Sequence, residues 1–336
     1  MNLPRLALLA ALACTPALAQ PVTAAAFDLK RPEIAAFVNQ VASRDGLSKK
    51  DVRAVLKAAQ PQPKILELMS RPIEKAPVPW WQYRDHFLTS ERIDGGVQFW
   101  NEHREALERS SAQYEVAPEY IVAILGVETK YGHVLGKYRV LDSLATLAFD
   151  YPPRQAFFRS ELEQFLILAH ENKLDPLTLV GSYAGAMGAP QFMPSSYRRY
   201  AVDANTDTQR DLWGDWDDII ASVANYLHEH GWAAGEPVLS EATLAGEASD
   251  GTDTQRVELN ETVAGLAARG VRLDLQLPPE TAAVLISAEQ RDGPAYRVGF
   301  HNFYVITRYN ASARYAMAVN DLAQTIAQRV QGVGAP

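Results

Sequence analysis

Residues 121–132 read IVAILGVETKYG, and this stretch decides how the chain is interpreted. Ile121 to Val127 has the composition of a helix inside a hydrophobic core, and Glu128 follows directly. An unpaired carboxylate is costly to bury, and burial disfavours its charged form, so we expect the pKa of Glu128 to be raised. The alternative is that Glu128 lies on the wet side of its helix or pairs with Lys130.

A carboxylic acid that is still protonated near neutral pH can donate its proton to a leaving oxygen. Cleavage of a glycosidic bond requires such a group. The residues around Glu128 therefore indicate acid catalysis as one candidate chemistry, although a single Glu is weak evidence.

The whole chain has 336 residues, with 47% hydrophobic and 21% charged residues, which is ordinary for a folded protein of one to three domains. The formal net charge is -8. Nucleic-acid-binding proteins usually carry a basic field, so we expect no nucleic-acid partner. We expect a monomer.

The N-terminus resembles an export signal, which we place at residues 1–19. Arg5 precedes the short apolar run LALLAALA, and Ala17-Leu18-Ala19 is typical of a cleavage site. Cleavage would remove Cys14, which is the one cysteine of the chain, and would release the protein into the periplasm. A second interpretation makes Cys14 a lipid-attachment site, but the preceding residues fit that signal poorly.

The remaining chain predicts an α+β protein that is predominantly α-helical. We expect a helical region at 20–79, a core at 80–236, a small β-rich domain at 237–300 and a segment at 301–336 that returns to the core. Helical spacing predicts one long helix from Glu91 to Ser111, whereas VRLDLQ, AAVLISAE, AYRVGF and NFYVITRY show β-rich or alternating patterns.

The stretch GSYAGAMGAPQFMPSS, which begins at Gly181, combines small residues with Met and Gln. It lacks the GK[ST] ending of a phosphate-binding loop. A tight turn against the core is one interpretation. The other is a loop that lets a bulky glycan approach the backbone, with Ser182, Met187 and Gln191 facing it.

The acidic stretch 203–218 begins like a calcium-binding EF-hand loop. Asp203, Asn205 and Asp207 occupy the first, third and fifth positions, and the main chain of Gln209 occupies the seventh. Thr208 replaces the usual Gly at the sixth position, and Gly214 stands where a bidentate Glu is usual. An acidic surface loop is the alternative.

Four stretches together resemble the membrane-bound lytic murein transglycosylase B family: GVETKYG, GAMGAPQFMPSSYRRYAVD, LWGDWDDIIASVANYLHEHGW and NFYVITRYN. The resemblance runs from about Trp80 to Val319. It implies a lysozyme-like catalytic core, with an added helical domain, that cleaves the MurNAc–GlcNAc β-1,4 bond of peptidoglycan and leaves 1,6-anhydro-MurNAc ends. It also implies a role in cell-wall turnover.

The resemblance assigns roles to particular residues. It makes Glu128 the acid and then the base of the reaction. It implies that a second set of residues contacts the glycan strand or lies near Glu128: Tyr83, Ser182, Gln191, Tyr226, Tyr309, Asn310 and Tyr315. Met187 joins this set from the interpretation of the loop as a glycan-binding segment. The family also has a longer EF-hand-like loop closed by an Asp, which here is Asp218, with Asp217 as the alternative.

No cofactor is expected for the chemistry, and Ca²⁺ is expected in a structural role. Peptidoglycan strands are the expected partner, and proteins of cell-wall synthesis or division are further candidates. Two other functions remain open at this point: a hydrolytic goose-type lysozyme and a non-catalytic peptidoglycan-binding protein.

Overall fold

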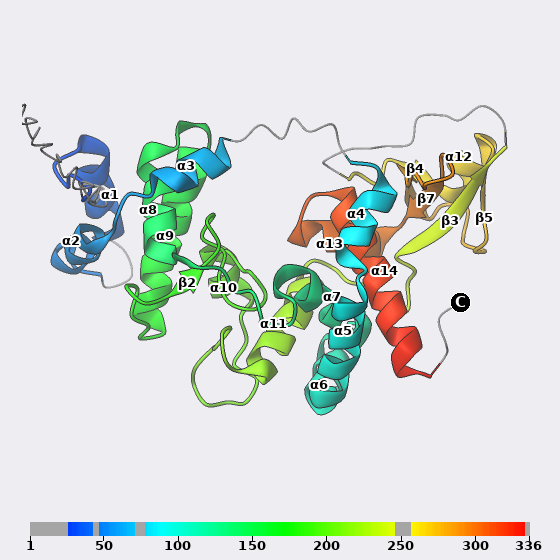
Figure 1. Ribbon diagram of the computed structural model, residues 1–336, viewed down its shortest axis with the longest axis horizontal. Coiled ribbons are helices and arrows are strands. Elements are labelled where there is room, and N and C mark those ends of the chain that lie inside the picture. The colour runs from blue at the N-terminus through cyan, green and yellow to red at the C-terminus, as the bar shows by residue number, and fades with distance from the viewer. Residues whose placement is uncertain (1–25, 43–46, 71–77, 246–256, 333–336) are drawn as a thin grey trace, which may run out of the picture.

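The computed structural model describes residues 26–42, 47–70, 78–245 and 257–332. Helices dominate it, as expected, and Figure 1 shows them on both sides of the centrally placed α7. The predicted signal segment and Cys14 lie outside the described residues. No helix within the described ranges is long and apolar enough to cross a membrane.

The helices of the N-terminal half are α1 (Pro32–Ala42), α2 (Lys49–Ala58), α3 (Pro63–Met69), α4 (Trp80–Phe87), α5 (Ser90–Glu102), α6 (Arg104–Tyr114), α7 (Pro118–Thr129), α8 (Val140–Asp150), the short 3₁₀ helix η1 (Pro152–Arg154) and α9 (Gln155–Glu171). Those of the C-terminal half are α10 (Pro194–Tyr200), α11 (Trp216–Glu229), α12 (Val263–Ala268), α13 (His301–Tyr309) and α14 (Ala313–Val330).

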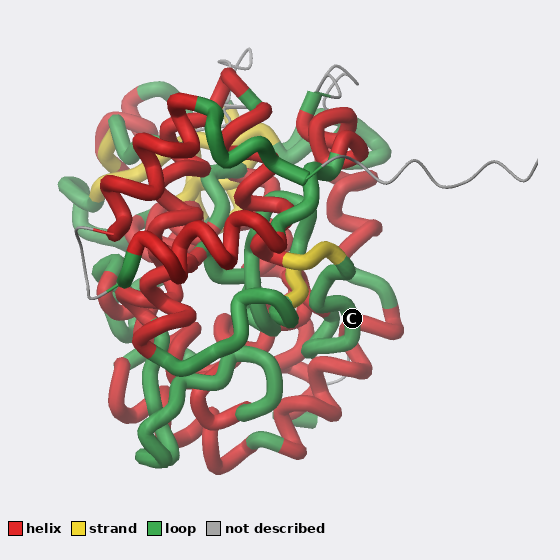
Figure 2. The backbone as a smooth tube through the Cα atoms, turned by 90° about the vertical axis from the view of Figure 1, so that its left-hand side faces the viewer, coloured by secondary structure: helices red, strands yellow, loops and turns green. Residues whose placement is uncertain are grey.

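The strands form two sheets, which Figure 2 shows as separate yellow segments in a mostly helical chain. The small sheet pairs β1 (Tyr138–Arg139) with β2 (Val180–Gly181). The larger one has the antiparallel order β4-β6-β7-β3-β5. Its strands are β3 (Leu239–Leu244), β4 (Glu261–Thr262), β5 (Val271–Leu273), β6 (Ala282–Ser287) and β7 (Tyr296–Gly299). The division of the chain into domains stays a prediction.

The larger sheet is packed on both faces. Successive residues of a strand point to opposite sides, and β6 uses this alternation. Val284 and Ile286 belong to the main hydrophobic core, whereas Ala283 and Leu285 join a smaller core that includes Leu266 of α12. The sheet is therefore fixed against the helical body rather than attached through a linker alone.

α7 runs through the middle of the main core. Pro118 opens it, at a position where proline's missing N–H breaks no helical hydrogen bond. Every residue from Tyr120 to Gly126 is buried, so this helix is apolar all round, as expected for a central helix. α14 packs along α7 and also contacts α4, α5 and α13.

Two expectations about local structure are wrong. The helix predicted from Glu91 to Ser111 is interrupted at His103, whose ring packs on Phe99 and Trp216 with centroid distances of 4.5 and 5.3 Å. The segment NFYVITRY, which shows a β-rich pattern, forms α13. Its β-branched residues favour a strand, but the buried positions of Asn302, Phe303 and Ile306 fit one helix face, and tertiary packing decides.

Candidate active site

Glu128 lies in the last turn of α7, just before a strained turn of the backbone. Lys130, Tyr131 and Gly132 have consecutive φ angles of 49°, 59° and 83°. Only the last is a glycine, and left-handed backbone is uncommon for other residues. The N–H of Lys130 donates to Gly126 O at 3.2 Å and that of Tyr131 to Leu125 O at 3.1 Å, which caps the helix end.

The side chain of Tyr131 fixes this turn. Its hydroxyl donates to Arg92 O at 2.8 Å, and its ring passes over Gly126. The Arg92 guanidinium is buried and donates to three carbonyls: Gly126 at 3.0 Å, His86 at 2.9 Å and Phe87 at 2.7 Å. Burial lowers the pKa of Arg92. Arg92 therefore ties the end of α7 to α4 and α5.

Thr129 ties the same helix end to the Gly- and Met-rich loop. Its hydroxyl donates to Ala189 O at 2.8 Å and accepts from the N–H of Gly132 at 3.1 Å. Thr129 is buried, whereas Glu128 beside it keeps part of its surface open to solvent. Glu128 is thus held on rigid backbone with its side chain still accessible.

Among the residues that the structure describes, the carboxyl group of Glu128 has one hydrogen-bond partner, the hydroxyl of Tyr315 on α14, which donates to Oε1 at 2.6 Å. Burial raises the pKa of Glu128 to about 7, and the Tyr315 hydrogen bond acts in the opposite direction. The partial negative charge at the helix C-terminus also disfavours a carboxylate there. Glu128 can therefore both hold and release a proton near neutral pH.

Tyr309 and Tyr226 lie next to this pair. The Tyr309 hydroxyl donates to Pro190 O at 2.6 Å, and its ring centroid is 4.7 Å from that of Tyr226. Burial raises the pKa of Tyr309, and the charge of Glu128 raises it further. Tyr226 is 7% exposed and donates to Arg308 O at 2.5 Å, so most of its ring is core.

The other predicted glycan contacts surround this centre. Tyr83 is half-buried beside Trp80 and Phe87. Its pKa is raised, mainly by burial. The charge of Arg314 opposes this shift, and that of Glu128 adds to it. Asn310 is exposed at the end of α13, where its Oδ1 accepts from the N–H of Ser312 at 3.2 Å.

In the Gly- and Met-rich loop, the predicted residues differ in what they present. Met187 is fully buried. The Ser182 hydroxyl accepts from the N–H groups of Ala184 and Ala186 at 3.3 and 3.0 Å. Gln191 adopts a φ of 53° and donates from Nε2 to Gly188 O at 2.9 Å. Within the described part of the chain, the side-chain amide oxygen of Gln191 accepts no hydrogen bond. It can therefore accept one from a ligand.

The acidic loop folds around its own carboxylates. Asp203 accepts from the N–H groups of Asp207 and Thr208 at 3.1 and 2.8 Å, and Asn205 Oδ1 accepts from Asp207 N at 2.9 Å. Asp207 Oδ1 accepts from Gln209 N at 2.8 Å. Thr208 has a φ of 75°, the left-handed backbone for which glycine is the usual residue at this position.

Asp218 closes the loop from the first turn of α11. It is 1% exposed and accepts from Ala204 N at 2.7 Å and Asp211 N at 2.8 Å. Burial raises its pKa, and the nearby charges of Asp215 and Asp203 raise it further. A cation would relieve this repulsion, and amide and main-chain oxygens complete a ligand set that suits Ca²⁺.

Two observations limit the metal assignment. Among the described residues, no three His, Cys, Asp or Glu side chains converge on one metal position. Asp217, the alternative closing residue, instead forms an ion pair with Arg109, whose Nη2 lies 3.0 Å from Asp217 Oδ2. Within the part of the chain that the structure describes, the carboxylates of the expected set, Asp203, Asp207 and Asp218, are therefore not gathered around one position.

Sequence reasoning missed the residues that hold Glu128 in place. Arg92 and Tyr131 were not predicted to have roles, although Tyr131 belongs to the stretch quoted at the outset. A buried arginine followed by two glycines, as in Arg92-Ile93-Asp94-Gly95-Gly96, gives no recognisable local signal. Gly126 could have indicated that another group approaches the helix closely.

Comparison with known proteins decides the family. Residues 30–324 match the family described as the transglycosylase SLT domain. The chain is 41% identical over 309 residues to the membrane-bound lytic murein transglycosylase B of Escherichia coli strain K12, covering 89% of this chain and 84% of that protein. This chain belongs to the SLT-domain transglycosylases. The family resemblance drawn from the motifs is confirmed.

Solved structures agree. The Escherichia coli lytic transglycosylase SLT35 in complex with calcium is 40% identical, with a TM-score of 0.83 over 92% of this chain and 97% of that one. The Pseudomonas aeruginosa SltB3 in complex with NAG-NAM-pentapeptide is 32% identical, with a TM-score of 0.76 over 87% of this chain and 78% of that one. The predominantly helical, lysozyme-like fold is confirmed, and the enzyme is a peptidoglycan lytic transglycosylase.

Proposed function

We propose that the enzyme cleaves the MurNAc–GlcNAc β-1,4 bond of peptidoglycan in cell-wall turnover and leaves a 1,6-anhydro-MurNAc end, with Glu128 acting first as acid and then as base. The contact between Glu128 and Tyr315 carries this proposal. It combines a carboxyl group whose pKa lies near 7 with a hydroxyl that donates to its charged form.

The reaction has two proton transfers through one residue. Protonated Glu128 gives its proton to the glycosidic oxygen, the C1–O4 bond breaks with its electron pair on the GlcNAc oxygen, and positive charge develops at C1 of MurNAc. The C6 hydroxyl of the same MurNAc then attacks C1, and the Glu128 carboxylate takes its proton. No water is consumed, so no second carboxylate is needed to activate one.

In this proposal, Tyr315 acts on Glu128 after the first proton transfer, when Glu128 is ionised. Its hydrogen bond to Oε1 stabilises Glu128 while the residue is a carboxylate, that is, between the two proton transfers. Burial favours the protonated state before and after. The two opposing influences keep the pKa close to working pH, where one group can serve as acid and as base.

The residues around Glu128 supply sugar contacts in this proposal. Aromatic faces stack on sugar rings, which fits the half-buried ring of Tyr83. The side-chain amide oxygen of Gln191, which accepts no hydrogen bond from the described residues, suits the N–H of an acetamido group. The full set of proposed contacts is Tyr83, Ser182, Gln191, Tyr226, Tyr309, Asn310 and Tyr315. Met187 was also expected to contact the glycan, but its side chain is fully buried and does not reach a ligand.

Ca²⁺ is proposed as a structural ion of the acidic loop, held by Asp203, Asn205, Asp207, the main chain of Gln209 and Asp218. The related Escherichia coli structure is a complex with calcium, and the charges of Asp203 and Asp215 near Asp218 support a cation in this loop. The protein is proposed to act in the periplasm after removal of residues 1–19, with lipid attachment at Cys14 as the alternative.

Replacement of Glu128 tests the proposed role. The Glu128→Gln variant should bind purified peptidoglycan sacculi as the wild type does and should lose turnover by at least about a thousandfold, since it removes the group that carries both proton transfers. Sedimentation with sacculi measures binding, and chromatographic release of soluble muropeptides measures turnover. Appreciable release by the variant would refute the role of Glu128.

A further inference from the structure

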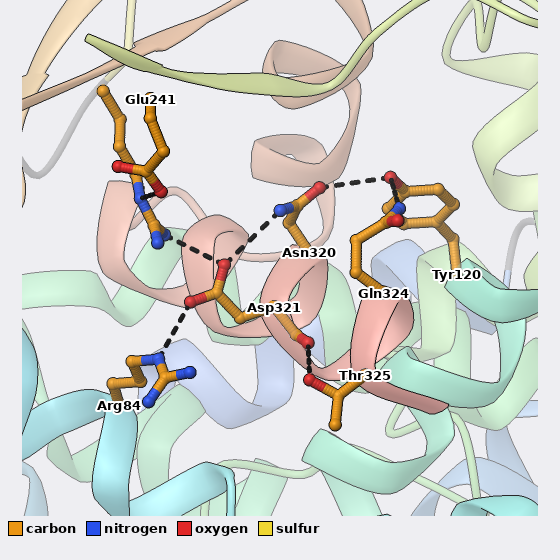
Figure 3. Close-up of polar contacts among 8 residues, drawn as sticks. Arg84, Tyr120, Glu241, Asn320, Asp321, Gln324 and Thr325 are labelled. Atoms are coloured by element: carbon orange, nitrogen blue, oxygen red, sulfur yellow. Dashed lines mark hydrogen bonds and ion pairs between the residues drawn. The ribbon is translucent and has the colours of Figure 1, made fainter. Parts of the chain in front are cut away.

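Asp321 of α14 forms ion pairs with arginines from two other parts of the fold (Figure 3). Arg84 of α4 donates from Nε to Asp321 Oδ2 at 3.1 Å, and Arg297 of β7 donates to Asp321 Oδ1 at 2.9 Å. The Asp321 and Arg297 side chains are 9% and 10% exposed. Ion pairs that are this buried are costly to break from one side, because the remaining charge loses its partner.

Arg297 belongs to the larger sheet and is fixed there as well. Its Nε donates to Glu241 of the neighbouring strand β3 at 2.8 Å, and its guanidinium lies 5.4 Å from the ring centroid of Trp80 on α4. Glu241 therefore holds the Arg297 guanidinium in place within the sheet, independently of its ion pair with Asp321. The sheet, α4 and α14 meet at this one guanidinium.

A second contact between the sheet and α4 lies at the turn between β6 and β7. Glu289 O accepts from the N–H of Trp81 at 3.1 Å. Arg291 pairs with Asp85 at 2.5 Å, and its guanidinium lies 4.3 Å from the ring centroid of Trp81. This turn of the sheet thus holds α4 both by a backbone hydrogen bond and by side-chain contacts.

Polar contacts also fix the position of this part of α14 along α7. Tyr120 of α7 donates to Asn320 Oδ1 at 3.1 Å and accepts from Gln324 Nε2 at 3.1 Å, and both contacts are visible beside Asp321 in Figure 3. α14 therefore cannot slide along α7 without breaking these polar contacts. Its position is set jointly by α7 and by the sheet.

α14 carries the hydrogen-bond partner of the proposed acid, and α4 carries Tyr83, a proposed sugar contact. Tyr83 is the neighbour of Arg84 on α4, and Tyr315 precedes Asp321 by six residues, or less than two turns, on α14. A shift of α14 at Asp321 would therefore move the Tyr315 hydroxyl, which lies 2.6 Å from Glu128 Oε1.

We propose that Arg297 is a positioning residue: through its ion pair with Asp321, the larger sheet sets the placement of Tyr315 against Glu128. This inference rests on the proposed function of Glu128 and adds a role for the sheet in it. The sheet acts as a brace that holds α4 and α14 together around the acid. Arg297 itself touches neither Glu128 nor Tyr315 in this arrangement, since its polar partners are Glu241 and Asp321.

The test compares Arg297→Gln and Arg297→Lys with wild type in the full-length enzyme on a soluble muropeptide substrate. Arg297→Gln should lower kcat by about tenfold or more with KM within about twofold, because small displacements of reacting groups are costly whereas the sugar contacts remain. Arg297→Lys keeps the charge and should recover most of that loss. If Arg297→Gln does not fold, Asp321→Asn, which keeps the shape of the side chain, takes its place.

The pH profile of kcat separates positioning from general destabilisation. Loss of the Tyr315 contact raises the pKa of Glu128, so both Tyr315→Phe and Arg297→Gln should move the alkaline limb to higher pH. In the double variant Tyr315→Phe/Arg297→Gln, the alkaline limb should move as far as in Tyr315→Phe alone. Both substitutions act by removing the same hydrogen bond between Tyr315 and Glu128, so their effects should not add. An unmoved limb in Arg297→Gln, or additive shifts, would overturn the proposal.

Arg329→Gln is the matched control. Arg329 is also on α14 and pairs with Asp94 of α5 at 2.8 Å, but both side chains are exposed and the sheet is not involved. This variant should keep the wild-type kcat and pH profile. A wild type without activity, or an active Glu128→Gln, would refute the proposed function instead, so the two failures can be told apart.

Discussion

At the scale of the residue, the proposed acid Glu128 makes the fold less stable as pH rises. Its pKa is about 7 in the fold against 4.5 for an ordinary Glu, so the folded state binds the proton more tightly than the unfolded chain does. Stability is therefore lost as pH rises from about 4.5 through about 7. At about 1.4 kcal/mol per pKa unit, the loss is on the order of 3 kcal/mol.

Glu128→Gln should therefore stabilise the protein more at pH 8 than at pH 5, because Gln cannot ionise. Thermal unfolding of wild type and variant at the two pH values measures the difference. Glu108→Gln, on the exposed surface of α6, is the control and should show none. Equal effects of Glu128→Gln at both pH values would contradict the assigned pKa.

The sequence predicts the direction of this pKa shift from the apolar neighbours of Glu128 alone. It does not predict the residue that limits the shift. Tyr315 lies 187 positions further along the chain, and no local spacing connects it with Glu128. The family resemblance names Tyr315 as a glycan contact, whereas the structure makes it a direct hydrogen-bond donor to the acid.

At the scale of the element, the end of α7 depends on a glycine inside a helix. A Cβ on Gly126 would lie 2.5 Å from the Tyr131 hydroxyl oxygen and 2.7 Å from the ring atom that carries it. Tyr131 cannot move freely because its hydroxyl donates to Arg92 O at 2.8 Å. The glycine is therefore required by close packing against Tyr131, although it weakens the helix.

Gly126→Ala should consequently destabilise the protein by about 1–3 kcal/mol, although alanine is the better helix former. In a Tyr131→Leu background, which removes the outer part of the ring, the same substitution should cost much less. Chemical denaturation of the four proteins measures this coupling. An equal cost of Gly126→Ala in both backgrounds would show that Tyr131 is not the obstacle.

The acidic loop carries strain at Thr208. A β-branched residue at a φ of 75° is disfavoured, and glycine adopts this conformation without steric cost. Thr208→Gly should stabilise the calcium-loaded protein by about 1 kcal/mol and lower the Ca²⁺ concentration that half-saturates the rise in Tm.

Thr208→Ala is the control for that substitution, because it removes the branched side chain but keeps the Cβ that clashes in this conformation. It should bring little gain. Titration of Tm with Ca²⁺ against EDTA measures all three proteins. If wild type shows no Ca²⁺-dependent rise in Tm, the proposed metal role of the loop is wrong.

Local pattern predicts most helices but fails where packing decides. The apolar spacing from Gln155 to Asn172 is typical of a helix, and the structure has α9 (Gln155–Glu171) there. The break at His103 arises from ring contacts with Trp216, more than a hundred residues away. α13 reads as a strand because Val305, Ile306 and Thr307 are β-branched, and only its packing between the sheet and the core makes it a helix.

At the scale of the whole molecule, the site is assembled from segments far apart in the chain. α7 supplies the proposed acid, α14 its hydrogen-bond partner, and the loop at 181–194 the neighbouring backbone. Figure 1 shows α4, α5, α7 and α14 side by side, as their contacts also indicate. Periodicity cannot predict such an assembly, which is why the family resemblance was needed to bring these segments together.

The product of the reaction tests the central proposal most directly. Mass spectrometry of muropeptides released from purified sacculi compares wild type with Glu128→Gln. An anhydro end formed by the C6 hydroxyl makes the product lighter than the hydrolysed muropeptide by the mass of one water, and we expect such products from wild type alone. Products carrying the added water would instead identify a hydrolytic lysozyme, and a folded wild type that releases none would indicate a binding protein.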